Sequence, residues 1–452
     1  MYVNLDIFKA YDVRGRFPEE INAKAAYIIA RAFIELIRGK NKNRLRVVVA
    51  SDARTSSPEL KKAVIEGLLD EGVSVIDQGY ATTPFHYYSV FALEADGGIM
   101  VTASHNSYQD NGLKFTRKAG EPMGDGLEIM KNISRRGIFT KHDGRGEVVE
   151  QNLHREYIDF LISRVDLSKA GDMHIILDAG GGMASLLLPQ LVKKLPCKTT
   201  IINGDLFFDL RHEPLNPIKE ESLATLKNTV LEHRADLGVA FDADGDRSGF
   251  VTQNARYFRS DYVGAFLARE LLKLHAGAAV VHDIRSSSIF RETIIANGGR
   301  PLESRVGHRF IKELMRKEGA IFAAEQSGHF YFQDIGYVDS DFLPFLMFLQ
   351  FVAESRKDAD TILSEFDVYP SSGEVNFKVK SKEGLLENIA HHFKDARETK
   401  WTDGLSLYYD DWWANIRMSN TEPLVRLNVE ARTSEILKAK VAELKGLLRG
   451  AA

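Results

Sequence analysis

The sequence predicts an α/β protein whose chain closes with a smaller α+β domain. Apolar strand-like segments alternate with amphipathic helix-like segments over most of the chain, which is typical of α/β folds. From residue 372 onwards, three strand-like segments share the chain with two helical stretches, a pattern typical of an α+β domain. The length of 452 residues exceeds what one hydrophobic core usually holds, so we expect several domains.

The first domain is expected to begin with an amphipathic helix and to continue through three strands. Apolar residues recur at helical spacing up to Gly39, which ends the first helix. A second helix is expected to have Ser57 as its N-cap and Pro58 in its first turn, because both residue types are favoured there. The predicted helices are residues 23–38 and 56–72, and the predicted strands are residues 45–52, 73–79 and 97–104.

Three later segments contain strands that lead into glycine or polar residues. Residues 174–195 predict a strand, a glycine turn and a helix. Residues 236–246 predict a strand that leads into three aspartates, and residues 278–288 predict one that leads into Arg285 and serines. Ligands of open α/β sheets bind at the carboxyl ends of strands. These strand ends therefore indicate an active site divided among successive α/β units.

The end of the chain differs from the α/β units that precede it. Its predicted strands are residues 372–380, 405–411 and 423–432, and its predicted helices are residues 385–396 and 434–450. Domain boundaries are expected near residues 150, 253 and 367. This division gives α/β domains at residues 1–150, 151–253 and 254–366 and an α+β domain at residues 367–452.

Composition and charge argue against several classes of protein. The formal net charge of −4 makes broad electrostatic capture of nucleic acid unexpected. Cys197 is the single cysteine, so neither an intramolecular disulfide nor a cysteine-cluster metal site is expected. The longest apolar stretch, residues 342–353, contains a proline and is too short to span a bilayer. The first residues lack the basic start and apolar run of a secretory signal, so we expect a cytoplasmic protein.

The segment FDADGDR places Asp242, Asp244 and Asp246 at alternate positions. Three carboxylates this close repel one another unless a cation lies between them, and hard divalent cations prefer oxygen ligands. The segment is no EF-hand, whose sixth position requires Gly and whose twelfth requires Glu, because Arg247 and Gln253 stand there. A solvated acidic turn is the alternative. If the loop holds Mg²⁺, three side-chain oxygens leave room on an octahedral ion for a phosphate.

The segment VTASHNSYQDNGLKF contains Ser104 without the flanking glycines of a nucleophile elbow. Neighbouring side chains on an extended chain point apart, so we expect His105 to be a poor base for Ser104 and expect no hydrolase triad. A turn or a helix cap is the ordinary role of a lone serine. Together with a metal loop, Ser104 becomes a candidate carrier of a phosphoryl group, with Lys114 as a nearby basic residue.

Further polar clusters indicate an anionic ligand that is rich in hydroxyl groups. Arg14 lies in the glycine turn YDVRGR, and His308 and His329 each stand beside a glycine. Glu325 and Ser327 alternate with His329, so all three side chains can face one sugar. The segment RMSNTEPLVR offers basic, hydroxyl and amide groups suited to a phosphate, namely Arg417, Ser419, Asn420 and Thr421. Each cluster alone also fits an ordinary surface turn, but together they favour a sugar phosphate.

Four motifs in this order, TASHN, DADGDR, EQSGH and RMSNTEP, resemble those of the α-D-phosphohexomutase family. The resemblance covers the whole chain, from YDVRG near its start to the SNTEP loop near its end. It implies four domains around a central cleft. Three of these would be related α/β domains with mixed sheets, and the fourth a smaller α+β domain. It also implies an isomerase that acts on hexose phosphates.

The resemblance assigns a role to each candidate residue. It implies that Ser104 is a phosphoserine and that it completes a Mg²⁺ site. The other implied metal ligands are Asp242, Asp244 and Asp246. The implied catalytic positions are Ser104, Arg14, Lys114, His308 and His329. Of these, we expect Lys114 and His329 to transfer protons. The implied substrate-binding residues are Arg247, Glu325, Ser327, Arg417, Ser419, Asn420, Thr421 and Arg426.

The implied reaction has two halves. Phospho-Ser104 gives its phosphoryl group to a hexose phosphate, the resulting hexose 1,6-bisphosphate turns over in the cleft, and the other phosphate returns to Ser104. Mg²⁺ is the implied cofactor and hexose 1,6-bisphosphate the implied activator. Hexose phosphates are the implied partners, without nucleic acid or membrane, and we expect a monomer or a homodimer.

The segments FKAYDVRG, HEPLNP and SNTEPLVRLNVEA are similar to the phosphomannomutase and phosphoglucomutase branch of the family. We therefore expect interconversion of mannose 1-phosphate and mannose 6-phosphate, with glucose phosphates as further substrates. Phosphoglucomutase and phosphoglucosamine mutase are the alternatives, and an inactive sugar-phosphate sensor is the alternative that is not an enzyme. The chain departs from the family pattern at Ser107, where proline is usual, and at Ala324, where glycine is usual.

Overall fold

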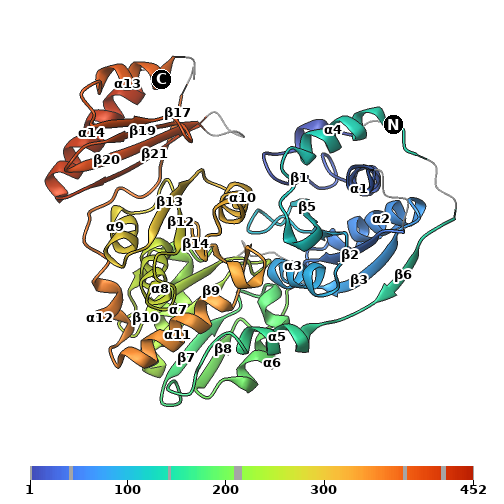
Figure 1. Ribbon diagram of the computed structural model, residues 1–452, viewed down its shortest axis with the longest axis horizontal. Helices are drawn as coiled ribbons and strands as arrows, with labels where there is room; N and C mark the ends of the chain where they lie inside the picture. Colours follow the sequence, from blue (N-terminus) through green and yellow to red (C-terminus); the bar gives the residue numbers. More distant parts are fainter. Residues whose placement is uncertain are drawn as a thin grey trace.

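The computed structural model describes residues 3–39, 44–140, 144–207, 216–379, 384–418 and 424–450. Within these residues four sheets follow one another along the chain, the first three mixed and the fourth antiparallel throughout (Figure 1). The predicted fold class is therefore confirmed. In Figure 1 the first sheet (blue) and the fourth (red) lie on opposite sides of the molecule. The domain boundaries near residues 150, 253 and 367 stay a prediction.

The first sheet has the strand order β1-β5-β4-β2-β3-β6. Its elements are β1 (Val13–Arg16), α1 (Ala23–Arg38), β2 (Arg46–Ser51), α2 (Ser57–Asp70), β3 (Ser74–Tyr80), α3 (Thr83–Ala92), β4 (Gly97–Val101), β5 (Asp110–Arg117), α4 (Gly126–Arg136) and β6 (Glu147–Glu150). The predicted first helix is confirmed by α1. The prediction that Ser57 caps α2 is wrong, because Ser56 is the N-cap. The Ser57 hydroxyl instead donates a 2.5 Å hydrogen bond to Asp52.

The second and third sheets repeat the α/β pattern. The second has the order β11-β10-β9-β7-β8 and the third the order β13-β12-β14-β15-β16. The elements of the second are α5 (His154–Ile162), β7 (His174–Asp178), α6 (Leu188–Leu191), β8 (Lys198–Ile202), α7 (Ala224–His233), β9 (Leu237–Phe241), β10 (Ser248–Thr252) and β11 (Tyr257–Phe258). Those of the third are α8 (Ser260–Leu274), β12 (Ala279–Asp283), α9 (Ser288–Ala296), β13 (Arg300–Ser304), α10 (His308–Glu318), β14 (Phe322–Ala324), β15 (Phe330–Phe332), β16 (Val338–Asp339), α11 (Leu343–Ser355) and α12 (Ala359–Ser364).

The fourth sheet has the order β17-β21-β20-β19-β18. Its elements are β17 (Val375–Lys378), α13 (Leu385–His392), β18 (Glu398–Lys400), β19 (Leu405–Tyr408), β20 (Trp412–Met418), β21 (Leu424–Ala431) and α14 (Ser434–Gly450). The segment RMSNTEPLVR begins within a strand, because Arg417 belongs to β20 and pairs with Arg426 of β21. The HEPLNP segment lies mostly outside the described residues.

A shared apolar core joins the second and third sheets to each other, whereas the fourth sheet does not belong to this core. One core extends from β9 and β10 into α8 and α11, and it reaches Phe85 of α3. The apolar stretch that forms α11 is therefore explained by burial in this core. The fourth sheet has a core of its own with α13 and α14. None of the described helices is long and apolar enough to cross a membrane.

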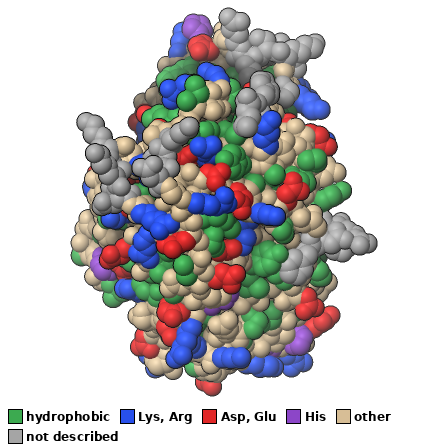
Figure 2. All heavy atoms as spheres, turned by 90° about the vertical axis from the view of Figure 1, so that its right-hand side faces the viewer, with side chains coloured by type: hydrophobic (Ala, Val, Ile, Leu, Met, Phe, Trp, Pro, Cys, Tyr) green, Lys and Arg blue, Asp and Glu red, His purple; other side chains and the backbone are tan. Residues whose placement is uncertain are grey.

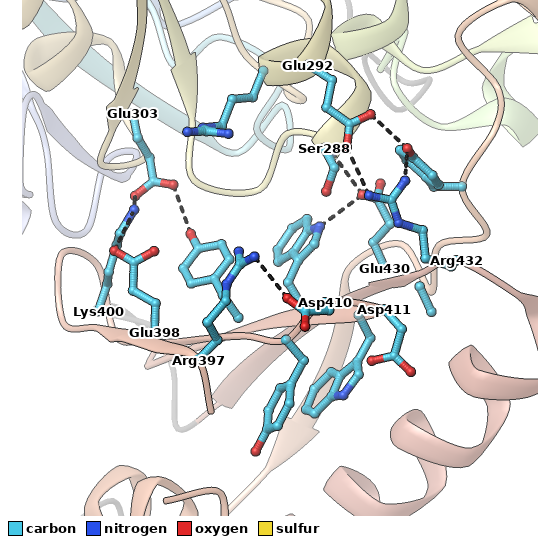
Figure 3. A pocket seen from close by; sticks show the side chains of 17 residues that line it. Ser288, Glu292, Glu303, Arg397, Glu398, Lys400, Asp410, Asp411, Glu430 and Arg432 are labelled. Atoms are coloured by element: carbon cyan, nitrogen blue, oxygen red, sulfur yellow. Dashed lines mark hydrogen bonds and ion pairs between the residues drawn. The ribbon is translucent and has the colours of Figure 1, made fainter. Parts of the chain in front are cut away.

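Polar contacts attach the fourth sheet to the third around a cavity of about 290 Å³ (Figure 3). Glu303 of β13 accepts hydrogen bonds from Tyr408 at 2.8 Å and from Lys400 at 3.3 Å. The buried carboxylate of Glu430 in β21 accepts one from the backbone N–H of Ser288, at the start of α9, at 2.8 Å. Glu303 and Glu430 are thus held by partners across the junction.

A buried carboxyl group, Asp341, links elements of the first three sheets. It accepts hydrogen bonds from Thr82, the N-cap of α3, at 2.9 Å and from Tyr157 of α5 at 2.6 Å. The backbone N–H of Phe342 donates a third at 2.7 Å. Burial outweighs these hydrogen bonds and raises the pKa of Asp341 to about 6. The folded protein therefore binds a proton at this carboxyl more tightly than the unfolded chain does.

We predict that Asp341→Asn removes a loss of stability that occurs on going from pH 4 to pH 7. The ordinary aspartate pKa is 3.8 and that of Asp341 is about 6, so the unfolded chain releases this proton first as the pH rises. The contribution of Asp341 to wild-type stability then falls by about 2–3 kcal/mol across this window, whereas asparagine cannot titrate. Denaturant unfolding at several pH values measures the difference. Parallel pH profiles of the two proteins would contradict the prediction.

Candidate active site

A cavity of about 770 Å³ is lined by segments that belong to or follow all four sheets. The structure brings together there most of the residues singled out in the sequence. Those that line the cavity are Arg14, Ser104, Lys114, Asp246, Arg247, His308, Glu325, Ser327, His329, Arg417 and Arg426. Asp242 and Asp244 are fully buried next to Asp246. Ser419, Asn420 and Thr421 lie outside the described residues.

Charge is distributed differently on the outer surface and in this cavity. On the face shown in Figure 2, acidic and basic side chains are interspersed without a field of one sign. Along the cavity, basic side chains outnumber acidic ones, although the chain as a whole has a net charge of −4. The cavity therefore suits an anionic ligand.

Ser104 follows β4 and has a backbone φ of 53°, a left-handed conformation that is uncommon for residues other than glycine. Its N–H donates a hydrogen bond to the Thr102 hydroxyl at 2.9 Å, which helps to hold this conformation. The left-handed turn ends the extended strand at the serine. Backbone strain of this kind is concentrated at functional sites, where the surrounding structure maintains it.

Arg54, which the sequence analysis did not single out, holds residues 104–110, the serine loop, in place. Its side chain is buried, with 2% exposed, and is anchored to Asp52 at 3.1 Å. The guanidinium donates hydrogen bonds to four backbone carbonyls of the loop at 2.6 to 3.0 Å. These carbonyls belong to Ser104, Asn106, Ser107 and Asp110. Its place just after β2, at the carboxyl end of a strand, is the signal that could have identified it.

His105 contradicts the expectation that it points away from Ser104. The Nδ1 atom of His105 lies 3.1 Å from Ser104 Oγ, within hydrogen-bond distance. The expectation assumed an extended chain, whereas the positive φ of Ser104 turns the backbone. The charge of Arg247, followed by burial, holds the pKa of His105 well below its usual value. The imidazole is therefore neutral at pH 7 and can accept a proton.

The three aspartates of the acidic loop form a buried cluster. One oxygen from each lies within 4.8 Å of the others, and Gly245 permits the tight turn with a φ of 71°. Asp242 Oδ1 accepts the backbone N–H groups of Asp246 and Arg247 at 3.0 and 3.2 Å. By contrast, the Oδ1 atoms of Asp244 and Asp246 have no hydrogen-bond partner among the described residues. Such converging carboxylate oxygens fit a hard divalent cation.

Lys114 of β5 supplies positive charge to this cluster from the first sheet. Its Nζ lies 2.7 Å from Asp244 Oδ2 and 2.6 Å from Asp246 Oδ2. Burial alone would lower the pKa of Lys114, but these two carboxylates outweigh burial and hold it well above its usual value. The pKa of Asp242, which lacks this contact, is instead raised by burial and by the charges of Asp246 and Asp244. Lys114 therefore compensates Asp244 and Asp246 directly, whereas Asp242 lacks this contact.

His329 lies between the acidic loop and the loop that contains Glu325. Its Nε2 is 3.5 Å from Asp246 Oδ1, and its Nδ1 is 3.2 Å from Glu325 Oε2. Burial lowers the pKa of His329, but the two carboxylates, Asp246 first, raise it to about 9. The ring therefore carries both protons at pH 7 in the absence of a metal. Glu325 is fixed in turn by the Tyr331 hydroxyl at 2.7 Å.

His308 and Arg14 lie at the same cavity in different states. Neither ring nitrogen of His308 has a hydrogen-bond partner among the described residues, and burial followed by the charge of Lys312 holds its pKa well below the usual value. The neutral ring packs edge-on against Tyr11, with centroids 4.9 Å apart. Arg14 donates hydrogen bonds to Asn106 at 2.7 Å and to Asp12 at 2.6 Å. Arg14 thereby joins β1 to the serine loop.

Four family models match this chain in order. They describe phosphoglucomutase/phosphomannomutase α/β/α domains I, II and III and the C-terminal domain. The matched residues are 5–137, 155–255, 259–369 and 374–446.

Curated and solved relatives extend over nearly the whole chain. A phosphomannomutase of Vibrio cholerae serotype O1 is 36% identical over 456 residues, which cover 98% of both chains. A phosphomannomutase of Methanocaldococcus jannaschii is 36% identical and covers 99% of this chain and 98% of its own. The crystal structure of a phosphoglucomutase/phosphomannomutase family protein from Burkholderia thailandensis gives a TM-score of 0.91 at 30% identity. That match covers 100% of this chain and 98% of the other.

We predict that Arg54→Lys loosens the serine loop while the fold remains intact. A lysine ammonium cannot reach four carbonyls at once, and each buried carbonyl left unpaired costs about 1–3 kcal/mol. Amide hydrogens of residues 104–110 should exchange roughly 10–100-fold faster, as measured by hydrogen-exchange mass spectrometry. Arg46→Lys, at an exposed arginine of the same sheet, is the matched control. Unchanged exchange in this loop would show that Arg54 does not hold it.

Proposed function

From the premise that this chain belongs to the phosphoglucomutase/phosphomannomutase family, we propose that it interconverts mannose 1-phosphate and mannose 6-phosphate. The chain is a phosphohexomutase and thus an isomerase. Glucose 1-phosphate and glucose 6-phosphate are proposed as further substrates, because mannose and glucose differ only in the orientation of the C2 hydroxyl. A site that does not bond this hydroxyl discriminates weakly between the two sugars. The names of the curated relatives support mannose as the first choice.

The observation that carries this proposal is the position of Ser104 Oγ. It lies 3.5 Å from Asp242 Oδ2, at the edge of the carboxylate cluster, in a cavity lined with arginines. A phosphoryl group on Ser104 would approach three carboxylates, which requires a cation between them. The Oδ1 atoms of Asp244 and Asp246, which have no hydrogen-bond partner among the described residues, would provide ligands for such a cation. We propose that Asp242, Asp244, Asp246 and phospho-Ser104 would hold Mg²⁺, which would supply positive charge beside the transferred phosphoryl group.

In the first half of the proposed reaction, the bond between Ser104 Oγ and phosphorus breaks and a substrate hydroxyl oxygen bonds to the phosphorus. The hydroxyl releases its proton, and a proton reaches Ser104 Oγ. A hexose 1,6-bisphosphate results. In the second half the other phosphate is transferred to Ser104, and these proton movements are reversed. The serine ends phosphorylated, as it began, which accounts for hexose 1,6-bisphosphate as an activator of the unphosphorylated enzyme.

The titration states of the cavity suggest how the protons are handled. Without a metal, His329 is doubly protonated and can donate a proton, whereas His308 is neutral and can accept one. His105 Nδ1 lies 3.1 Å from Ser104 Oγ and can take its proton when the serine is phosphorylated again. Lys114 remains charged because two carboxylates bind it, so it contributes mainly positive charge beside the transferred group.

We propose that the remaining cavity residues bind the substrate. Glu325 and Ser327 face the cavity beside His329 and would accept and donate hydrogen bonds to sugar hydroxyls. Arg417 and Arg426 would bind the phosphate that does not react. Arg247, at the edge of the acidic loop, and Arg14, at the serine loop, would bind near the reacting phosphate.

We predict that Ser104→Ala lowers kcat/KM for mannose 1-phosphate by about 10³-fold or more, because no other group can carry the phosphoryl. The assay contains Mg²⁺ and a trace of hexose 1,6-bisphosphate, and glucose 1-phosphate is run alongside to give the sugar preference. Ser107→Ala, an exposed serine of the same loop, is the matched control. If the wild-type protein binds hexose phosphates but does not turn them over, the interpretation as a sugar-phosphate sensor applies. If only glucosamine phosphates are turned over, the chain is a phosphoglucosamine mutase.

We also predict that Asp244→Asn weakens Mg²⁺ binding by about 10-fold or more, because the amide removes one charge from the ligand set. Isothermal titration calorimetry with MgCl₂ measures this affinity without any substrate. Asp334→Asn, at an exposed aspartate, is the control. Equal Mg²⁺ affinity in the wild type and in Asp244→Asn would remove the acidic loop as the metal site.

A further inference from the structure

We propose that Glu374 is an internal counter-ion that competes with the substrate phosphate for an arginine cluster formed by Arg285, Arg417 and Arg426. This inference rests on the proposed function, because it concerns the arginines assigned there to the phosphate that does not react. It adds a residue that the motifs do not contain. Its consequence is that substrate binding must displace a carboxylate of the protein.

Glu374 binds the arginines with both of its oxygens. Oε2 accepts a hydrogen bond from Arg417 Nη2 at 2.9 Å, and Oε1 accepts one from Arg426 Nη1 at 3.2 Å. Arg285 Nη1 approaches Oε2 to 4.0 Å from the third sheet. All four residues line the 770 Å³ cavity. The carboxylate therefore occupies the position where an oxyanion of a ligand would bind Arg417 and Arg426, near Arg285, which is itself paired with Asp283 at 2.6 Å.

The cluster needs an anion for its own stability. Arg417 of β20 and Arg426 of β21 are direct cross-strand partners, and like charges in such a pair repel. Burial, followed by the charge of Arg285, lowers the pKa of Arg417, while Glu374 acts in the opposite direction. The Nε atoms of Arg285, Arg417 and Arg426 have no hydrogen-bond partner among the described residues. The cluster thus retains donors that Glu374 does not use.

Glu374 is placed so that a ligand can displace it. Its side chain is 26% exposed, and it follows Gly373, which also lines the cavity. A carboxylate carries one negative charge, whereas a phosphate monoester dianion carries nearly two and offers three oxygens. The dianion can therefore replace Glu374 on the arginines. The arginines are then never without a counter-ion, but ground-state binding of phosphate is weakened by the competition.

Weakened binding has a role in the proposed reaction. One phosphate of the hexose 1,6-bisphosphate must leave the arginines before that phosphate can reach Ser104. A carboxylate that returns to the arginines as the phosphate leaves would favour this release. Binding that is equally tight in the ground state and the transition state gives no rate advantage, so a weakened phosphate site is compatible with fast turnover.

The test is the affinity of inorganic phosphate for Glu374→Gln, measured by isothermal titration calorimetry. EDTA is present, so that no metal recruits phosphate to the acidic loop. We expect Glu374→Gln to bind phosphate about 3–10-fold more tightly than the wild type, with the difference shrinking as NaCl is raised. Glu387→Gln, at an exposed glutamate of the same domain, is the control and should match the wild type. Circular dichroism confirms that the variants are folded.

Two outcomes would overturn the inference. Equal phosphate affinity would show that Glu374 does not compete, and weaker affinity would show that it orients the arginines instead. Arg426→Gln serves as a second variant and should weaken phosphate binding if the titration reports this cluster. These results do not depend on turnover, so a wild type without mutase activity would refute the proposed function and leave this test valid. If the enzyme is active, KM for mannose 1-phosphate should fall in Glu374→Gln without a rise in kcat.

Discussion

Three buried carboxylates on one loop are the constraint on which the rest of the site depends. Asp242, Asp244 and Asp246 cannot remain close together in a buried position without positive charge. The second sheet, which carries the loop, provides Arg247 at 3.8 to 3.9 Å, whereas Lys114 comes from the first sheet at 2.6 to 2.7 Å. The ion pairs of Lys114 therefore join the first two sheets at the point where Ser104 lies.

The histidines around the loop differ in state because burial and neighbouring charges differ at each ring. His329, in contact with Asp246 and Glu325, has a raised pKa, whereas His105 near Arg247 and His308 near Lys312 have lowered pKa values. Acid and base forms of the same residue type are thus available in one cavity at one pH. Such separation of pKa values by environment is typical of sites that transfer protons in both directions.

Features formed by residues close together in the chain could be predicted from the sequence. The alternate aspartates and the order of strands and helices are short-range patterns, so the acidic loop and the fold class could be predicted. Arg54 and Glu374 act on groups more than forty residues away, and no local pattern reports such contacts. His105 was misjudged for a related reason. Its direction depends on the left-handed backbone of Ser104, which Arg54 and Thr102 help to maintain.

The two charge clusters of the cavity suit the two ends of one substrate. The Oδ1 atoms of Asp244 and Asp246 and the Nε atoms of the arginine cluster have no hydrogen-bond partner among the described residues, so neither cluster is fully satisfied by the protein alone. The arginines are divided between the third and fourth sheets, and the fourth has a separate core and polar contacts to the third. A dianion that bridges Arg285 and Arg417 would therefore add an ionic link between these sheets. Phosphate binding would then be coupled to the position of the fourth sheet, since Arg285 follows a strand of the third sheet and Arg417 belongs to the fourth.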